Sequence, residues 1–191
     1  MALLDTFVRH TAVKALAQLE KHQTHMCAIA GLAGYGNTFL LEEITGVQAH
    51  RGPDDAGVWE RDARAGTWVG LGSRRLAIQD LSSAGHMPMS TADGVCTIVY
   101  NGEIYNSAEL RLQLQSKGYR FRSSSDTEVI LYLYQEYGSD CVGKLNGMFA
   151  FAIWDEAKQR LLLRAITLEL NLFITPFKMV SLVSLQKQRR C

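Results

Sequence analysis

The sequence predicts an α+β fold in which sheets are covered by helices. Three observations support this prediction. Strand-like and helix-like segments follow one another in the order strands, two helices, strands; all 16 glycines lie between Gly31 and Gly147; and 47% of the 191 residues are hydrophobic against 20% charged. This composition is typical of a globular chain with a buried core. The glycine-free ends indicate a central domain with an appendage on each side.

Residues 1–25 are predicted to form one amphipathic helix, because apolar residues recur in steps of three and four. We interpret them as a leader, or as sequence upstream of a second start at Met26. A targeting or membrane-surface helix is the alternative, although Asp5 and Glu20 dilute the basic character that such helices need. No uncharged apolar run approaches about 18 residues, so we expect no membrane contact and a cytoplasmic protein with reduced thiols.

The first half of the domain is predicted to be mainly strands. Cys27–Ala33 is short and apolar and is followed by glycines, as in a buried strand. A short helix is expected over 39–48. The run His50–Gly57 combines glycine, proline and charged residues and therefore predicts a loop. Three further strands are expected near 56–60, 67–72 and 75–80.

The second half is predicted to contain a strand, two helices and a hairpin. After a turn at 85–89, the apolar strand Val95–Tyr100 runs into Asn101-Gly102, a dipeptide that favours positive backbone dihedrals and so predicts a turn at the strand end. Ser107 and Asp126 are suitable N-caps for two helices. The expected elements are helices over 107–117 and 126–137 and hairpin strands over 148–154 and 160–164.

Charge and cysteine spacing argue against two classes of function. Residues 27–164 carry 13 basic and 16 acidic side chains, a formal charge of −3, so nucleic-acid binding is not expected. The four cysteines, at positions 27, 96, 141 and 191, are too far apart for a structural zinc site or a disulfide scaffold. We therefore predict no metal site.

Cys27 is ambiguous when it is considered alone, because a cysteine in an apolar strand is more often a core residue than a nucleophile. If translation starts at Met26 and this methionine is removed, Cys27 carries both a thiol and an α-amine. The amine, with a pKa of about 7.7–8.0, is then able to take the proton of a thiol whose pKa is about 8.5. The five histidines offer no convincing triad and are expected to be structural or exposed.

Seven segments together carry a resemblance to a known family. They are Met26–Gly31, His50–Asp55, Leu71–Ile78, Ala84–Met89, Tyr100–Asn106, Ser125–Leu131 and Leu145–Asp155. In this order they resemble a class II glutamine amidotransferase domain, most closely the N-terminal glutaminase domain of glutamine-hydrolysing asparagine synthetase. The phosphoribosyl and fructose-phosphate amidotransferases are a weaker alternative, because the Tyr100–Asn106 and Leu145–Asp155 segments favour the asparagine synthetase branch.

The resemblance implies a fold and its limits. It implies an N-terminal-nucleophile hydrolase domain over 26–164, an αββα sandwich of two antiparallel sheets between helix layers, with an incomplete C-terminal part. Residues 165–191 do not match the family and are interpreted as an unmatched tail, while 1–25 precede the domain. The alternative is that the tail takes the place of the missing strands, because Ile166, Leu168, Leu170 and Leu172 alternate as in a strand. The synthetase domain is expected to be absent, because no Ser-Gly-Gly-x-Asp-Ser loop is found.

The resemblance also assigns catalytic residues. Cys27 would attack the side-chain amide of glutamine, forming a glutamyl thioester and releasing ammonia, and water would then free glutamate. The side chain of Asn101 and the backbone N–H of Gly102 would form the oxyanion hole. While residues 1–25 remain attached, Cys27 lacks its amine and activity is expected to be lost. A catalytically silent fragment or glutamine-binding remnant of the same fold is therefore the alternative function.

Glutamine recognition is assigned in the same way. Arg75 would bind the α-carboxylate by a planar bidentate pairing, and Glu103 and Asp126 would hold the α-ammonium. Without the resemblance, Arg75 would be read as a surface salt-bridge residue and Asp126 as a helix cap. Ser73 stands where the family often has histidine. Glutamine hydrolysis is expected to need no cofactor, whereas ATP and magnesium would serve only a synthetase domain or subunit that receives the ammonia.

Overall fold

The computed structural model describes most of the predicted domain. The described residues are 27–34, 36–77, 80, 82–166, 173–175 and 179–181. The helix predicted over 1–25 lies outside them, as does most of the segment 165–191.

The elements follow the expected order with small shifts at their ends. They are β1 (Ala28–Gly34), α2 (Thr38–Gly46), β2 (Asp55–Asp62), β3 (Trp68–Arg75), β4 (Met89–Ser90), β5 (Cys96–Ile104), α3 (Ser107–Ser116), α4 (Asp126–Tyr137), β6 (Gly147–Asp155), β7 (Arg160–Ile166), β8 (Phe173–Thr175) and β9 (Met179–Ser181). Single 3₁₀ segments are formed by Arg64–Gly66, Ser83–Gly85 and Gly138–Lys144.

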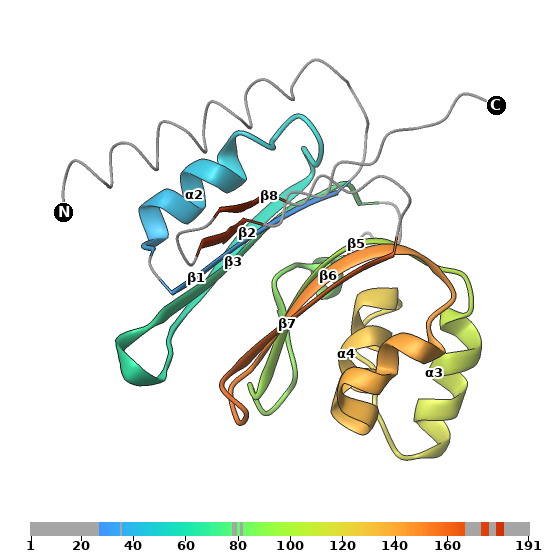
Figure 1. Ribbon diagram of the computed structural model, residues 1–191. Helices are drawn as coiled ribbons and strands as arrows, with labels where there is room; N and C mark the ends of the chain where they lie inside the picture. Colours follow the sequence, from blue (N-terminus) through green and yellow to red (C-terminus); the bar gives the residue numbers. More distant parts are fainter. Residues whose placement is uncertain are drawn as a thin grey trace, which may run out of the picture.

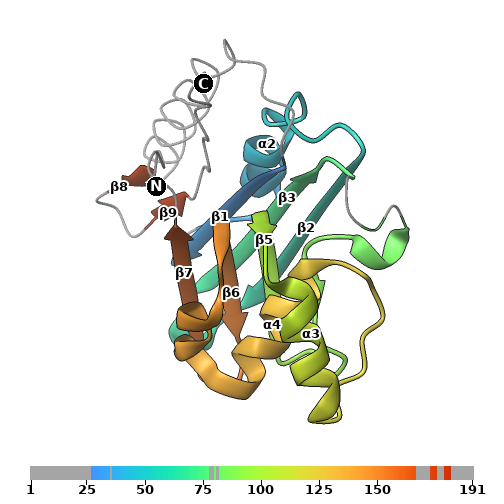
Figure 2. The same cartoon turned by 90° about the vertical axis from the view of Figure 1, so that its right-hand side faces the viewer.

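The strands form two antiparallel sheets that pack face to face. The first has the strand order β1-β3-β2 and the second the order β4-β5-β6-β7. Figure 1 shows α2 on the outer side of the first sheet, and α3 and α4 on the outer side of the second. Figure 2 shows both sheets from the side that carries the two helices. The predicted α+β architecture, two antiparallel sheets between helix layers, is confirmed.

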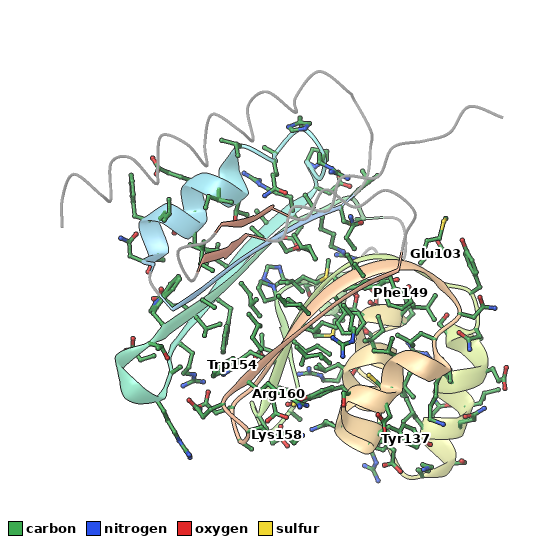
Figure 3. The ribbon with its side chains drawn as sticks, viewed as in Figure 1. Glu103, Tyr137, Phe149, Trp154, Lys158 and Arg160 are labelled. Carbon is green, nitrogen blue, oxygen red and sulfur yellow. The ribbon has the colours of Figure 1, made fainter. Side chains whose placement is uncertain are left out.

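Three layers of buried apolar side chains hold the four structural layers together. One layer lies between α2 and the first sheet, one between the two sheets, and the largest between the second sheet and its helices. Alternate residues of β6 serve two of these layers, because side chains of a strand point to opposite faces in turn. Phe149 packs on the helix side and Trp154 between the sheets (Figure 3).

Local sequence explains where α2 and α4 begin. The predicted cap Ser107 is instead the first residue of α3, and the N-cap of α3, Asn106, makes no side-chain cap hydrogen bond. The Asn37 carboxamide accepts a hydrogen bond from the Leu40 amide at 2.9 Å and caps α2. The Ser125 hydroxyl accepts from the Thr127 amide at 3.0 Å and caps α4. The prediction that Asp126 caps this helix is therefore wrong by one residue, because Asp126 is the first residue of α4 and its carboxylate bonds elsewhere.

Two predicted features around the strands are also wrong. The strand expected over 75–80 is absent among its described residues, because β3 ends at Arg75, where β1 and β2 also stop pairing with it. The turn expected at Asn101-Gly102 is absent too. Both residues continue β5, paired with Ala150 and Phe149 of β6. Gly102 does have a positive φ, +147°, as the dipeptide suggested.

The described part of the C-terminal segment consists of two short strands. β8 and β9 pair antiparallel with each other, and β9 contacts β1. The pairing of β7 with β6 extends to Ile166.

Candidate active site

The register of the first sheet directs Cys27 towards the space between the sheets. Ala28 pairs with Arg74, so Cys27 stands next to the end of β3. Ile29 and Leu71 pack between the sheets. Because every second residue shares a face, Cys27 on one strand and Arg75 on the other belong to this inner face.

The thiol of Cys27 is half-buried and is held by the backbone that follows β3. Its Sγ accepts a hydrogen bond from the Leu76 amide at 3.4 Å and lies 3.6 Å from the Leu76 carbonyl oxygen. Burial raises the pKa of the Cys27 thiol, and the Leu76 amide and the positive charge of Arg75 oppose this shift only in part. Cys27 is therefore mostly a thiol at neutral pH and needs a base to become a nucleophile.

The second sheet contributes its residues from β5. Val99 packs between the sheets, so Asn101 and Glu103, two and four residues further on, lie on the same inner face. Asn101 is buried, with 4% of its surface exposed. The structure therefore brings Asn101 to the face that opposes Cys27, where sequence analysis expects an oxyanion donor.

Gly102 occupies a position that only glycine fits. A Cβ there would lie 2.2 Å from the Met148 carbonyl oxygen and 2.5 Å from the Phe149 Cα. Its amide direction follows from Ile104, whose N–H leaves β5 on the side away from β6 to reach Asp126. Backbone groups two residues apart point to the same side of a strand. The Gly102 amide is thus directed to the free edge of β5, beyond the short strand β4.

Asp126 lies at this same edge and is buried, with 5% exposure. Its Oδ2 accepts hydrogen bonds from the Tyr100 hydroxyl at 2.6 Å and from the Ile104 amide at 3.2 Å. Burial raises the pKa of the Asp126 carboxyl, while these two donors act in the opposite direction.

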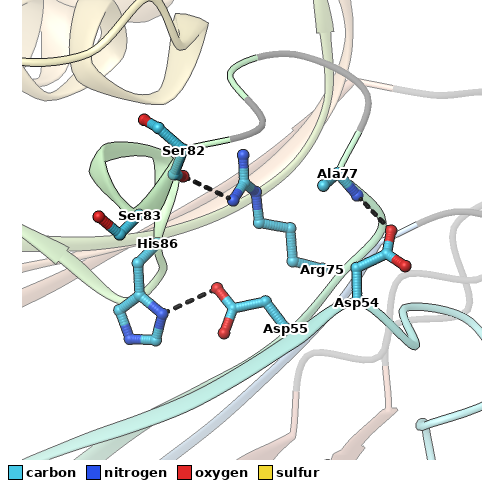
Figure 4. Close-up of a pocket in the computed structure, with 7 residues that line it drawn as sticks. All are labelled: Asp54, Asp55, Arg75, Ala77, Ser82, Ser83 and His86. Carbon is cyan, nitrogen blue, oxygen red and sulfur yellow. Dashed lines mark hydrogen bonds and ion pairs between the residues drawn. The ribbon is translucent and has the colours of Figure 1, made fainter.

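Arg75 opens onto a cavity of about 520 Å³ (Figure 4). Its guanidinium donates to the carbonyl oxygens of Asp80 and Ser82, the second at 3.4 Å. Gly85 makes room for this group, because a Cβ there would lie 2.4 Å from its Nη2 atom. The cavity is lined by Asp54, Asp55, Arg75, Ala77, Ser82, Ser83 and His86.

The predicted loop over 50–57 fixes the end of β3. The Asp54 amide donates to the Arg75 carbonyl at 3.1 Å, and the Asp54 carboxylate accepts from the Ala77 amide at 2.8 Å. A Cβ on Gly52 would lie 2.4 Å from the Arg74 carbonyl carbon, so this glycine permits the close approach of the loop. The loop over 50–57 therefore holds in place the backbone that carries both Arg75 and Leu76.

Sequence reasoning missed several contacts of the site. His86 pairs with Asp55, Nδ1 to Oδ2 at 2.8 Å, although the two are 31 positions apart (Figure 4). The contact of Tyr100 with Asp126 was not predicted, although strand alternation places the Tyr100 side chain on the face of the sheet away from Asn101. The Leu76 amide is a backbone group, so the type of residue at this position does not indicate its contact with Cys27. Arg51 is buried, which lowers its pKa, while the charge of Cys27 acts to raise it.

Within the described ranges, no group of three or more histidine, cysteine or acidic residues is arranged to hold a metal ion. In the same part of the chain, no helix is long and apolar enough to cross a membrane.

The site thus combines a cysteine next to the first strand of one sheet with Asn101 on the facing sheet, and comparison with known families identifies the class of protein that carries it. The chain belongs to the glutamine amidotransferase domain family, whose model matches residues 26–166. The prediction of this family is confirmed.

Two similar relatives come from Bacillus subtilis (strain 168). Asparagine synthetase [glutamine-hydrolyzing] 3 is 42% identical over 143 residues, which is 71% of this chain and 22% of the relative. Asparagine synthetase [glutamine-hydrolyzing] 1 is 44% identical over 117 residues, 61% of this chain and 18% of the relative. The chain thus spans about a fifth of the length of these relatives.

Among solved structures, the glutamine phosphoribosylpyrophosphate amidotransferase from B. subtilis has a similar fold. The TM-score is 0.56 and the sequence identity 23%, over 68% of this chain and 35% of that one. At this identity the similarity concerns the fold alone. It agrees with the predicted N-terminal-nucleophile hydrolase sandwich.

Proposed function

We propose that this domain hydrolyses the side-chain amide of glutamine, with Cys27 as the nucleophile. The observation that carries the proposal is the position of the thiol. Its Sγ lies beside the Leu76 amide and near the charge of Arg75, on the face that opposes Asn101. A nucleophile, a cation and an amide donor around one space suit acyl transfer.

The reaction balances without a cofactor. The Cys27 sulfur attacks the amide carbon of glutamine, and its proton passes to the leaving nitrogen, which departs as ammonia. A glutamyl thioester remains. Water then attacks the same carbon, giving glutamate and restoring the thiol.

The negative charge that develops on the amide oxygen needs fixed donors. We assign this role to the Asn101 side chain and the Gly102 amide, which lie on adjacent residues of a paired strand. Donors held by a sheet need little reorganisation during the reaction, and one such donor typically contributes about 10²–10³ in rate.

The charged end of glutamine is assigned to three residues. Arg75 would bind the α-carboxylate, since its guanidinium plane is fixed by the Asp80 and Ser82 carbonyls. Glu103 and Asp126 would bind the α-ammonium. Glu103 shares the inner face with Asn101, and Asp126 lies at the adjoining strand edge.

We assign the role of base to the α-amine of Cys27 in a chain that begins at this residue. Burial raises the pKa of the thiol, so a proton acceptor is required. An α-amine, with a pKa of about 7.7–8.0, meets this need near neutral pH. While residue 26 is attached, the same nitrogen is a peptide amide and accepts no proton.

The similarity to asparagine synthetases supports a proposal for the fate of the ammonia. An ATP- and magnesium-dependent synthetase part or partner would consume it in asparagine biosynthesis. ATP and magnesium would serve only that synthetase part, and glutamine hydrolysis itself would need no cofactor. We place the reaction in the cytoplasm, where such biosynthetic substrates are found.

A glutamine-binding domain without hydrolysis is the second candidate. It is favoured by the 26 residues that precede Cys27 in this chain. In that form the binding residues are all present, while the amine is not.

The two candidates are separated by comparing the full chain with a chain that starts at Met26 and loses this methionine. We expect only the second form to release ammonia from glutamine. A diazo-ketone analogue of glutamine should label its Cys27, as read by peptide mass spectrometry. Cys96 and Cys141 should stay unlabelled, because burial raises the pKa of their thiols to about 12 and about 11.

The matched control is Cys27→Ala in the shorter form, which should keep the unfolding temperature and release no ammonia. A folded chain with a free Cys27 that is neither labelled nor active would refute the proposed hydrolysis. Ammonia release by the Cys27→Ala variant would refute the role of the thiol.

A further inference from the structure

Tyr100 makes one of the shortest side-chain contacts near the site. Its hydroxyl donates to Asp126 Oδ2 at 2.6 Å, and both residues are buried, with 4% and 5% exposure. Tyr100 directly precedes Asn101 in β5, so the two side chains point to opposite faces of the second sheet. β5 therefore carries the expected oxyanion donor, Asn101, on one face and the contact with Asp126 on the other.

The contacts of Asp126 fix the direction of its carboxylate. Tyr100 reaches Oδ2 from the helix side of the sheet, and the Ile104 amide reaches the same oxygen from the free edge of β5. Two donors on one oxygen leave the carboxylate little freedom to rotate. Oδ1 is then the oxygen that remains for a ligand at this edge of β5.

The hydrogen bond also favours the charged form of Asp126. Burial raises the pKa of this carboxyl, and donation by Tyr100 is the largest influence that acts to lower it. An ammonium group binds a carboxylate far better than a neutral acid. Loss of the tyrosine hydroxyl would thus weaken a cation site even if the fold were unchanged.

We propose that Tyr100 is a positioning residue for glutamine recognition, which sets the orientation of the Asp126 carboxylate and thereby selects ligands that carry an α-ammonium group. The inference rests on the proposed function, because it needs glutamine as the ligand. Tyr100 itself does not touch the ligand.

A purely structural role is the competing explanation, and the chain contains a matched control. Tyr134 is buried and donates to Oδ2 of the buried Asp155 at 2.8 Å, at the β6–β7 hairpin. Tyr134→Phe removes an equivalent hydrogen bond from the same hydrophobic layer. It should affect stability without affecting ligand selection.

The test measures ligand binding by calorimetry to the full 191-residue chain carrying Cys27→Ala, so that no turnover occurs. The two ligands are glutamine and 4-carbamoylbutanoate, which lacks only the α-ammonium. Adding Tyr100→Phe should weaken glutamine binding about tenfold and leave the binding of 4-carbamoylbutanoate within about twofold. Adding Tyr134→Phe should change neither.

A second variant protects the test against a general loss of folding. In a chain with Asp126→Asn, the further change Tyr100→Phe should have no additional effect on glutamine binding, because the carboxylate that it positions is gone. Equal weakening for both ligands, or unchanged glutamine binding in the Tyr100→Phe chain, would overturn the inference alone. Absence of glutamine binding both to the parent chain and to the Cys27→Ala form of the shorter chain would instead refute the proposed function, and the inference with it.

Discussion

Two buried tyrosine–aspartate pairs lie in the same half of the molecule, in different surroundings. Asp126 at the site receives its hydrogen bonds from uncharged groups, the Tyr100 hydroxyl and the Ile104 amide. Asp155 at the hairpin accepts from the Tyr134 hydroxyl and also from the Lys158 ammonium at 2.8 Å.

Because of these different partners, the pKa values of the two carboxyls are shifted in opposite directions. Burial acts to raise the pKa of both carboxyls. At Asp155 burial is outweighed by the hydrogen bonds from Lys158 and Tyr134 together, so the pKa is lowered, whereas the pKa of Asp126 stays raised. The hairpin carboxylate is thus neutralised within the chain. Among the described residues, no ammonium group donates to the Asp126 carboxylate, which suits it to receive one from a ligand.

The largest expected effect is a loss of activity when Asn101, on the inner face of β5, is replaced, compared with a replacement away from that face. Asn101→Ala should lower kcat for glutamine about 10²–10³-fold, because one oxyanion donor is lost. The control is Asn106→Ala, which removes a carboxamide that bonds the Lys144 carbonyl at 2.9 Å, away from the inner face. Steady-state ammonia release checks both variants. Equal losses in the two would argue against a specific role of Asn101.

A smaller effect is expected from the backbone at Gly102. Gly102→Ala should lower the free energy of unfolding by about 2–3 kcal/mol, because the new Cβ would meet the Met148 carbonyl and the φ of +147° is unfavourable for alanine. Gly118→Ala is the control, since φ is +96° there and no atom lies within 4 Å of the new Cβ. Its loss should be about 1 kcal/mol. Urea unfolding measures both, and equal losses would contradict the steric explanation.

The smallest effects concern the two carboxylates and have opposite signs. The folded-state pKa of Asp155 is lowered, so its stabilisation is present above the ordinary pKa and is lost as pH falls through the folded value. Asp155→Asn should therefore reduce stability at pH 7 by about 1 kcal/mol, and the difference should shrink in acid.

For Asp126 the folded-state pKa is raised, so the ionised group disfavours folding at pH 7 and this effect disappears as pH falls through the folded value. Asp126→Asn should stabilise the fold at pH 7 while glutamine binding is lost. Urea unfolding at pH 7 and near pH 3 tests both variants. If both substitutions changed the free energy of unfolding at pH 7 in the same direction, the contrast between the two carboxylates would be wrong.

Much of the fold followed from local sequence. Apolar strands, capped helices and the glycine distribution predict nearly every element. The strand expected over 75–80 failed because alternation in one segment does not show whether a neighbouring strand pairs with it. The turn at Asn101-Gly102 failed for a related reason. The dipeptide indicates the backbone conformation of Gly102, but pairing with β6 decides that the strand continues.

The site was predictable only where residue type carries the chemistry. The structure places Cys27 and Arg75 on one inner face and Asn101 and Glu103 on the opposing one, as their expected roles require. The Leu76 amide, by contrast, is a backbone group that any residue supplies. The Tyr100–Asp126 contact joins residues 26 positions apart, so no local pattern announces it.

The short strand β4 has a consequence for how the domain avoids association with other chains. β4 pairs only with Thr97 and Ile98, so in the described structure β5 runs on towards Ile104 as an edge strand. Exposed strand edges invite pairing with a second chain, and proteins often block them with lysine, proline or a bulge. Here a buried aspartate covers one edge amide. Under the proposed function a bound glutamine would cover another, so that the ligand would also protect this edge against pairing with a second chain.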